Sequence, residues 1–181
     1  MKKLILISFL ITNIIASEIY KLDRDKSNSY YRANSSFLFF SKDEIIGVNK
    51  NLRGELVVNE DSIKGNISIN SGAFDTQNSK RDTHVREILN YKKYPNIKFK
   101  IENETINNSK TYLLGKLSIN GVEKSIKLAV EKSIKSDEIF YKGKTSIKYR
   151  DFNISPPTLG FIKEAKESIE IGAKFFFRKE K

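Results

Sequence analysis

The segment LLGKLSINGVEKSIKLAV, residues 113–130, decides the fold. On both sides of Asn120-Gly121, apolar and polar residues alternate with period two, which is typical of half-buried β-strands. Asn-Gly favours a type I′ turn, because both of its central positions need a positive φ. The segment therefore predicts a tight β-hairpin with one apolar face.

Similar runs recur along most of the 181-residue chain, and short polar turns such as Glu60-Asp61 separate them. They lie at residues 19–22, 30–40, 51–59, 62–70, 97–101, 139–150 and 169–177. This makes roughly eight short strands, which we expect to be antiparallel. Strands of this kind close into a barrel or pair as a sandwich, so the pattern predicts an all-β fold.

One helix is expected to interrupt the strands at about residues 79–89. Its apolar residues recur at helical spacing and are Val85, Ile88 and Leu89. Ser79 followed by Asp82 fits a capping box, and Tyr94-Pro95 ends the helical pattern.

Residues 1–17 have the layout of a secretory signal peptide: two lysines, an apolar run, and the small residues Ala16 and Ser17. We expect cleavage near Ala16 or Ser17, with residues 18–181 forming one domain in the periplasm or outside the cell. The chain has no cysteine, so this domain must fold without disulfides.

The chain is basic, with a formal net charge of +11. Without Lys2 and Lys3, 31 basic side chains still face 22 acidic ones. Such a balance suits anionic lipid headgroups, acidic envelope polymers or nucleic acid. The lysines are scattered rather than dense, which is typical of strands whose solvent face resists edge-to-edge pairing. We expect no nucleic-acid partner.

Three segments resemble the YceI-like family of exported lipid-binding or polyisoprenoid-binding proteins. RDTHVREILNYKKYPNIKF, residues 81–99, is similar to the family's Arg-Asp-x-His-Leu segment and its Tyr-Pro-x-Ile-x-Phe strand start. The hairpin of residues 113–130 is similar to its Gly-x-Leu-Thr-Ile-x-Gly-Val-Thr-Lys pattern. IKYRDFNIS, residues 147–155, follows the family's third pattern less closely, and Asn28-Ser29 stands where the family usually shows His-Ser.

The resemblance implies an antiparallel lipocalin-like β-barrel, with the helix near one opening and a hydrophobic tunnel. We therefore expect an exported, non-enzymatic protein that holds a long-chain isoprenoid, such as a quinone or polyprenyl compound, or a fatty-acid-like amphiphile. An alternative is a basic surface interaction module whose lumen is filled by side chains. The Phe37 to Phe40 run, apolar on both faces, is a candidate homodimer contact.

Strand parity selects the candidate ligand-binding residues, although it does not by itself tell which side of the sheet is inside. They are Leu56, Val58, Ile67, Ile69, Leu117, Ile119, Ile147, Ile171, Ala173 and Phe175. Glycines also interrupt the apolar faces, at Gly54, Gly65, Gly115 and Gly143. Two interpretations remain open for them, because strand glycines either let coiled strands bend or leave the lumen open.

His84 is the only histidine, so a multi-histidine metal site is excluded and no thiol exists for a mixed one. No nucleophile motif accompanies it. His84 is therefore either a packing or capping residue of the helix or, with Arg81 and Arg86, a contact for a ligand headgroup. We expect no catalytic residue, metal or cofactor, while an enzyme acting on a bound lipid would require His84 for turnover.

Overall fold

The computed structural model describes residues 17–37, 41–155 and 167–180. Its elements are β1 (Glu18–Leu22), β2 (Asn28–Phe37), β3 (Ser41–Asn49), β4 (Leu52–Asn59), β5 (Ser62–Asn70), α1 (Ser79–Ile88), β6 (Asn96–Asn107), β7 (Lys110–Ile119), β8 (Val122–Lys135), β9 (Glu138–Lys148), the 3-10 helix η1 (Tyr149–Phe152) and β10 (Ser168–Lys179). Neither helix within these ranges has the length and the apolar character that spanning a bilayer requires.

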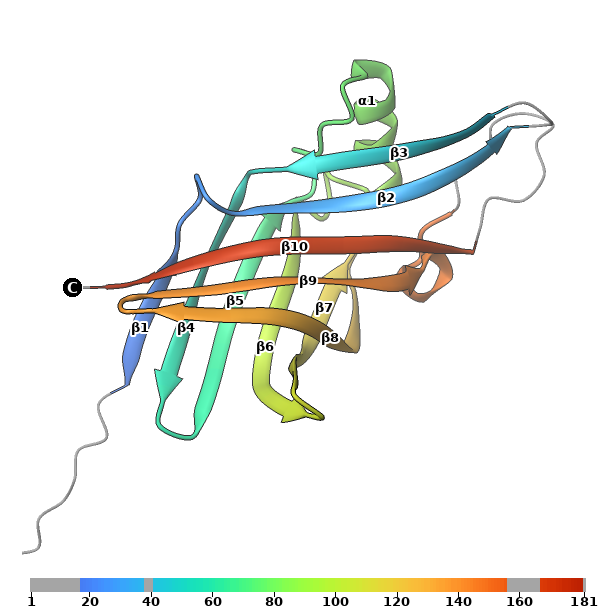
Figure 1. Cartoon of the computed structure of the whole chain (residues 1–181). Coiled ribbons are helices and arrows are strands. Elements are labelled where there is room, and N and C mark those ends of the chain that lie inside the picture. Colours follow the sequence, from blue (N-terminus) through green and yellow to red (C-terminus); the bar gives the residue numbers. More distant parts are fainter. Residues whose placement is uncertain (1–16, 38–40, 156–166, 181) are drawn as a thin grey trace, which may run out of the picture.

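Eight strands form a closed antiparallel barrel (Figure 1). The order runs β1-β4-β5-β6-β7-β8-β9-β10, and β1 returns to pair with the end of β10, opposite Phe177, Arg178 and Lys179. The earlier part of β10 pairs with β2, which in turn pairs with β3. The expected all-β fold, an antiparallel barrel of about eight strands with one helix, is confirmed.

The Asn120-Gly121 turn has the predicted geometry, with φ of 51° and 77°, and joins Ile119 directly to Val122. The Asn120 side chain also fixes the turn to η1, because its Nδ2 donates to the carbonyl oxygen of Asn153 at 2.9 Å. The hairpin is therefore determined both by its own backbone preference and by a long-range contact.

Two segments differ from the sequence prediction. β3 was not expected, because the adjacent Ile45 and Ile46 break the alternation; in the structure Ile46 faces out and is exposed. The strand expected to run through residues 149–150 ends instead at Lys148. There η1 begins, since a 3-10 turn brings Tyr149 and Phe152 onto one side, where both are buried.

The helix α1 lies within one residue of its predicted range, but the predicted capping box is wrong. Asn78 is the N-cap, and its side-chain oxygen accepts a hydrogen bond from the backbone N–H of Arg81. Asp82 instead accepts from the backbone N–H and the hydroxyl of Thr76, at 3.0 and 2.7 Å. Asp82 therefore fixes the loop before the helix, where the sequence pattern assigned it to the helix end.

Large side chains close one end of the barrel interior, which we call the packed end. Each is at most 2% exposed, and together they are Leu56, Ile67, Ile101, Leu113, Tyr141 and Phe177. The ladder alternates large and small residues here, since Leu56 pairs with Gly65, Gly65 with Ile101, and Ile101 with Gly115. Interdigitation of this kind gives a barrel its solid core.

The glycines of the apolar faces lie where neighbouring strands approach closely. A Cβ atom at Gly65 would lie 2.5 Å from Leu56 Cδ2 and 2.6 Å from the carbonyl oxygen of Glu55. At Gly115 it would overlap the carbonyl oxygen of Lys100. The interpretation that glycines allow the strands to coil tightly is therefore favoured over the interpretation of an open lumen.

We predict that Gly115→Ala lowers the free energy of unfolding by about 1–3 kcal/mol, because the backbone of Lys100 cannot move aside as a flexible side chain would. Urea denaturation measures this change. Ser125→Ala, at an exposed site on the paired strand β8, is the control and should stay within about 0.5 kcal/mol of the natural sequence. Equal stability of the two variants would contradict the prediction.

Candidate functional site

A cavity of about 700 Å³ lies above the packed end, enclosed by the barrel strands, β2 and α1. Pockets that bind small organic ligands commonly have volumes of about 300–1,000 Å³. The lining side chains are predominantly aliphatic or aromatic, and they come from β5 to β10 on one side and from α1 and β2 on the other. The site can therefore accept an apolar molecule.

The helix α1 supplies one wall of this cavity. Val85, Ile88 and Leu89, the apolar residues at helical spacing, all line it and pack against the edge of the hydrophobic core. No residue of α1 is fully buried, because its apolar face meets the cavity and not a solid core. The amphipathic pattern in the sequence thus indicates a cavity wall.

The structure brings together seven of the ten candidate ligand-binding residues. Those that line the cavity are Ile69, Leu117, Ile119, Ile147, Ile171, Ala173 and Phe175. Leu56 and Ile67 lie in the packed end instead, and Val58 is a partly buried residue two positions beyond Leu56 on β4. Parity indicates the inward face correctly here, but it carries no information about height along the barrel axis.

Sequence reasoning missed several lining residues. Phe99 and Leu128 lie on the apolar faces of the alternating runs at residues 97–101 and 122–130, so the sequence did carry a signal for them. Tyr31 and Phe74 lie on β2 and in the loop before α1, and only the tertiary structure places them at the cavity. Their rings make an edge-to-face contact with centroids 5.4 Å apart.

The glycine interpretation that assigned the lumen to missing side chains is wrong for the four glycines singled out. None of Gly54, Gly65, Gly115 and Gly143 lines the cavity. Side chains or carbonyl groups of adjacent strands cover them, as Leu56 covers Gly65. The open space lies instead where α1 and β2 extend over the barrel strands.

Polar side chains of α1, two of them cationic, line the outer part of the cavity. Lys80, Arg81 and His84 contribute to its lining, and no carboxylate of the described residues lies within 4.0 Å of Lys80 or Arg81. The His84 side chain is 53% exposed, with its Nδ1 3.6 Å from Glu87 Oε2. The outer part of the site can therefore face an anionic or oxygen-rich group.

Arg86, the third residue considered for a headgroup, is not part of the cavity lining. Its Nε donates to the carbonyl oxygen of Gly72 at 2.8 Å. This hydrogen bond ties α1 to the loop that follows β5, which gives Arg86 a structural role in positioning the helix.

Two buried oxygen atoms in the cavity wall have no hydrogen-bond partner among the described residues: Ser29 Oγ and Tyr31 Oη. Ser29 is only 5% exposed. Burial raises the pKa of Tyr31 to about 12, so the phenol stays protonated at neutral pH and remains a hydrogen-bond donor. Because buried polar atoms are nearly always paired, these two hydroxyl groups are available to bind a polar group.

Comparison with known proteins gives the same assignment of fold. The family described as YceI-like domain matches residues 20–176. Protein YceI from Salmonella newport (strain SL254) is 28% identical over 152 residues, which are 78% of this chain and 78% of that protein.

Solved structures share the barrel. BcnA from Burkholderia cenocepacia superposes with a TM-score of 0.72 at 17% identity, over 86% of this chain and 98% of that chain. A polyisoprenoid binding domain from Saccharophagus degradans gives a TM-score of 0.69 at 13% identity, over 89% and 98%. At these identities the similarity establishes a common fold.

We predict that Ala173→Phe reduces the binding of an apolar fluorescent probe, N-phenyl-1-naphthylamine, by about tenfold or more, because the added ring occupies cavity space. Fluorescence titration measures the affinity. Lys174→Ala, exposed on the opposite face of β10, is the matched control and should bind the probe unchanged. Normal probe binding by a folded Ala173→Phe protein would show that the cavity is not the binding site.

Proposed function

The chain belongs to the YceI-like family, and on this basis we propose that it is an exported binding protein for a long-chain isoprenoid or fatty-acid-like amphiphile. A quinone or a polyprenyl compound fits the isoprenoid class. The apolar cavity of about 700 Å³ is the observation that carries the proposal. The polyisoprenoid binding domain of Saccharophagus degradans, which shares the fold, supports the ligand class. The ligand would be held for transport, storage or sequestration.

Tail length should dominate the affinity. Each buried methylene contributes about 0.8 kcal/mol, whereas association costs about 4–15 kcal/mol before any net binding results. A short apolar molecule would therefore be held weakly, while a chain of about 20 carbons gains about 16 kcal/mol, enough to exceed this cost. The aliphatic walls supply this energy without any specific polar contact.

The polar end of the ligand would lie toward α1. Arg81 and His84 are proposed to contact the headgroup from the rim, joined by Lys80, while Ser29 and Tyr31 offer hydrogen bonds from the wall. The tail would then extend toward Phe99, Leu128 and Phe175. This orientation leaves charged groups near water and the chain among apolar side chains.

Binding without catalysis agrees with the arrangement of the reactive groups. Ser29 Oγ has no hydrogen-bond partner among the described residues, so no base is in place to activate it as a nucleophile. His84 faces Glu87 on an exposed part of the helix. The alternative of a surface interaction module assumed a lumen filled by side chains, which the cavity does not match.

Three further parts of the proposal rest on the sequence: export, the dimer contact and the single domain. Residues 1–16 and 38–40 lie outside the described residues, so the signal peptide and the dimer contact through Phe37 to Phe40 stay predictions. Export predicts a mature protein that begins near Glu18, while residues 18–181 form one domain.

The function is tested on protein purified from its native envelope. Organic extraction followed by mass spectrometry should yield about one long-chain lipid per chain. A lipid-free extract, combined with no uptake of added quinone or fatty acid, would contradict the proposed function.

We predict that Arg81→Gln weakens binding of palmitate about tenfold while leaving methyl palmitate nearly unchanged, because only the former offers a charge to the guanidinium group. Isothermal titration calorimetry measures both ligands. Arg53→Gln, exposed on β4 and absent from the cavity lining, is the control. Equal losses for both ligands would exclude a headgroup contact by Arg81.

A further inference from the structure

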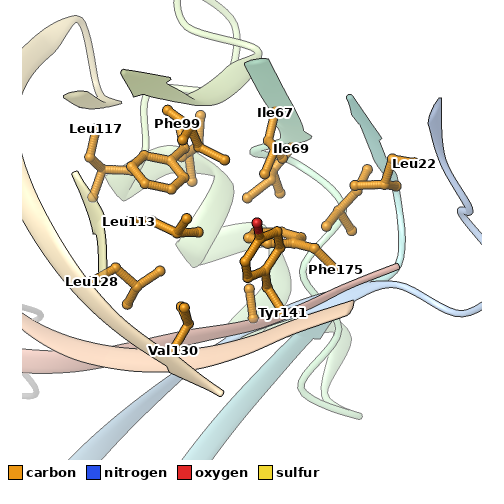
Figure 2. Packing of buried hydrophobic residues seen from close by; sticks show 14 of the residues in the cluster. Leu22, Ile67, Ile69, Phe99, Leu113, Leu117, Leu128, Val130, Tyr141 and Phe175 are labelled. Carbon is orange, nitrogen blue, oxygen red and sulfur yellow. The ribbon is translucent and has the colours of Figure 1, made fainter. Parts of the chain in front are cut away.

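The cavity ends at a floor formed by three cross-strand pairs. In each pair one residue lines the cavity and its partner belongs to the packed end: Leu128 with Leu113, Phe175 with Tyr141, and Phe99 with Ile67. Figure 2 shows these six side chains together. Because barrel strands tilt relative to the axis, partners in a ladder lie at different heights. The floor therefore follows the ladder around much of the barrel.

The packed end behind this floor is held by buried polar contacts as well as by packing. The Tyr141 hydroxyl donates to Glu104 Oε2 at 2.6 Å, and Lys132 Nζ lies 2.6 Å from Glu104 Oε1. The side chains of Glu104 and Lys132 are only 11% and 18% exposed. The Tyr141 ring also meets Phe177 edge to face, with centroids 6.5 Å apart.

A longer ligand tail could pass this end only by displacing these groups. Protein interiors are packed as densely as organic crystals, so they leave no space for a tail. Displacing Tyr141 would also break its hydrogen bond to Glu104, whose side chain has little access to water. The outer part of the cavity beside α1, which we call the mouth, offers the easier path, since His84 and Lys80 are exposed there. Excess chain length should therefore protrude into water at the mouth.

The cavity volume gives the length of tail that fits. The share of one water molecule in the liquid is about 30 Å³, and a methylene group has nearly the same size. A volume of 700 Å³ therefore corresponds to roughly 20–25 carbon atoms. This length equals about four to five prenyl units and leaves little room for the headgroup. It is well under the 40 carbons of an eight-unit chain.

We propose that the packed end is a stop that selects ligands by tail length, so that chains of about 20–25 carbons are preferred over both shorter and longer ones. Leu113 and Tyr141 determine its position, and Leu128 determines the floor on the cavity side. This inference rests on the proposed binding function, and it adds the substrate class within it.

The test uses quinones with two, four, six and eight prenyl units, offered together at equal mole fraction in detergent micelles to the delipidated full chain. Because every quinone leaves an apolar micelle, the general hydrophobic gain cancels and occupancy reports the fit. Mass spectrometry of the retained ligands should show a maximum at four units. We expect at least fivefold lower occupancy for eight units than for four.

Variants on the two sides of the floor should move this maximum in opposite directions. Leu113→Ala removes a fully buried side chain behind Leu128 and should raise the relative occupancy of six units about threefold. Leu128→Phe places a larger side chain at the floor, which leaves less cavity space for the tail. It should therefore favour the quinone with two units. This second variant removes no packing from the core, so it keeps the test decisive where Leu113→Ala does not fold.

Ile139→Ala is the matched control. Ile139 is 2% exposed and pairs with Phe177, on the side of the packed end away from the cavity. It should lower stability as a core truncation does while leaving the distribution of bound quinones unchanged.

The possible failures are distinguishable. Retention of no quinone of any length would overturn the proposed function together with the stop. Equal occupancy of all lengths, a maximum at eight units, or the same shift in Leu113→Ala and Ile139→Ala would overturn the stop alone, because binding itself would be present.

Discussion

The closure of the barrel by β1 is the constraint on which the rest of the structure depends. This five-residue strand pairs with β4 on one edge and with the end of β10 on the other. Tyr20 thereby pairs with Leu56, and Leu22 with Phe177, which are two residues of the packed end. Without this bridge, β4 and the end of β10 would be open edges, and the barrel would not close around one interior.

Closure creates one interior that is used in two ways. At the packed end, large side chains fill the space that glycines leave, as Leu56 does over Gly65. Near α1 the lining side chains face open volume and lose contacts that a filled core would provide. The first region stabilises the barrel, and the second retains unsatisfied apolar surface for a ligand to cover.

Local rules explain which parts of the fold could be predicted. The alternation in β4, β5 and β7 and the Asn120-Gly121 turn depend on residues close in sequence, so their hairpins were predictable. β3 was not, because it gains its order by pairing with β2 and carries an exposed Ile46 on its outer face. The helix cap was misassigned because Asp82 hydrogen-bonds to Thr76, a contact that competes with the capping box.

The sequence by itself determined most of the strands, the apolar face of each, the position of the helix and the resemblance to a family. Only the tertiary structure decided that Leu56 and Ile67 fill the packed end whereas Ile69 and Ala173 line the cavity. It also decided that Arg81 reaches the cavity while Arg86 binds the backbone at Gly72. The physical reason is that a period of two specifies a face, whereas depth along the barrel depends on strand tilt and register, which arise only when all eight strands pair.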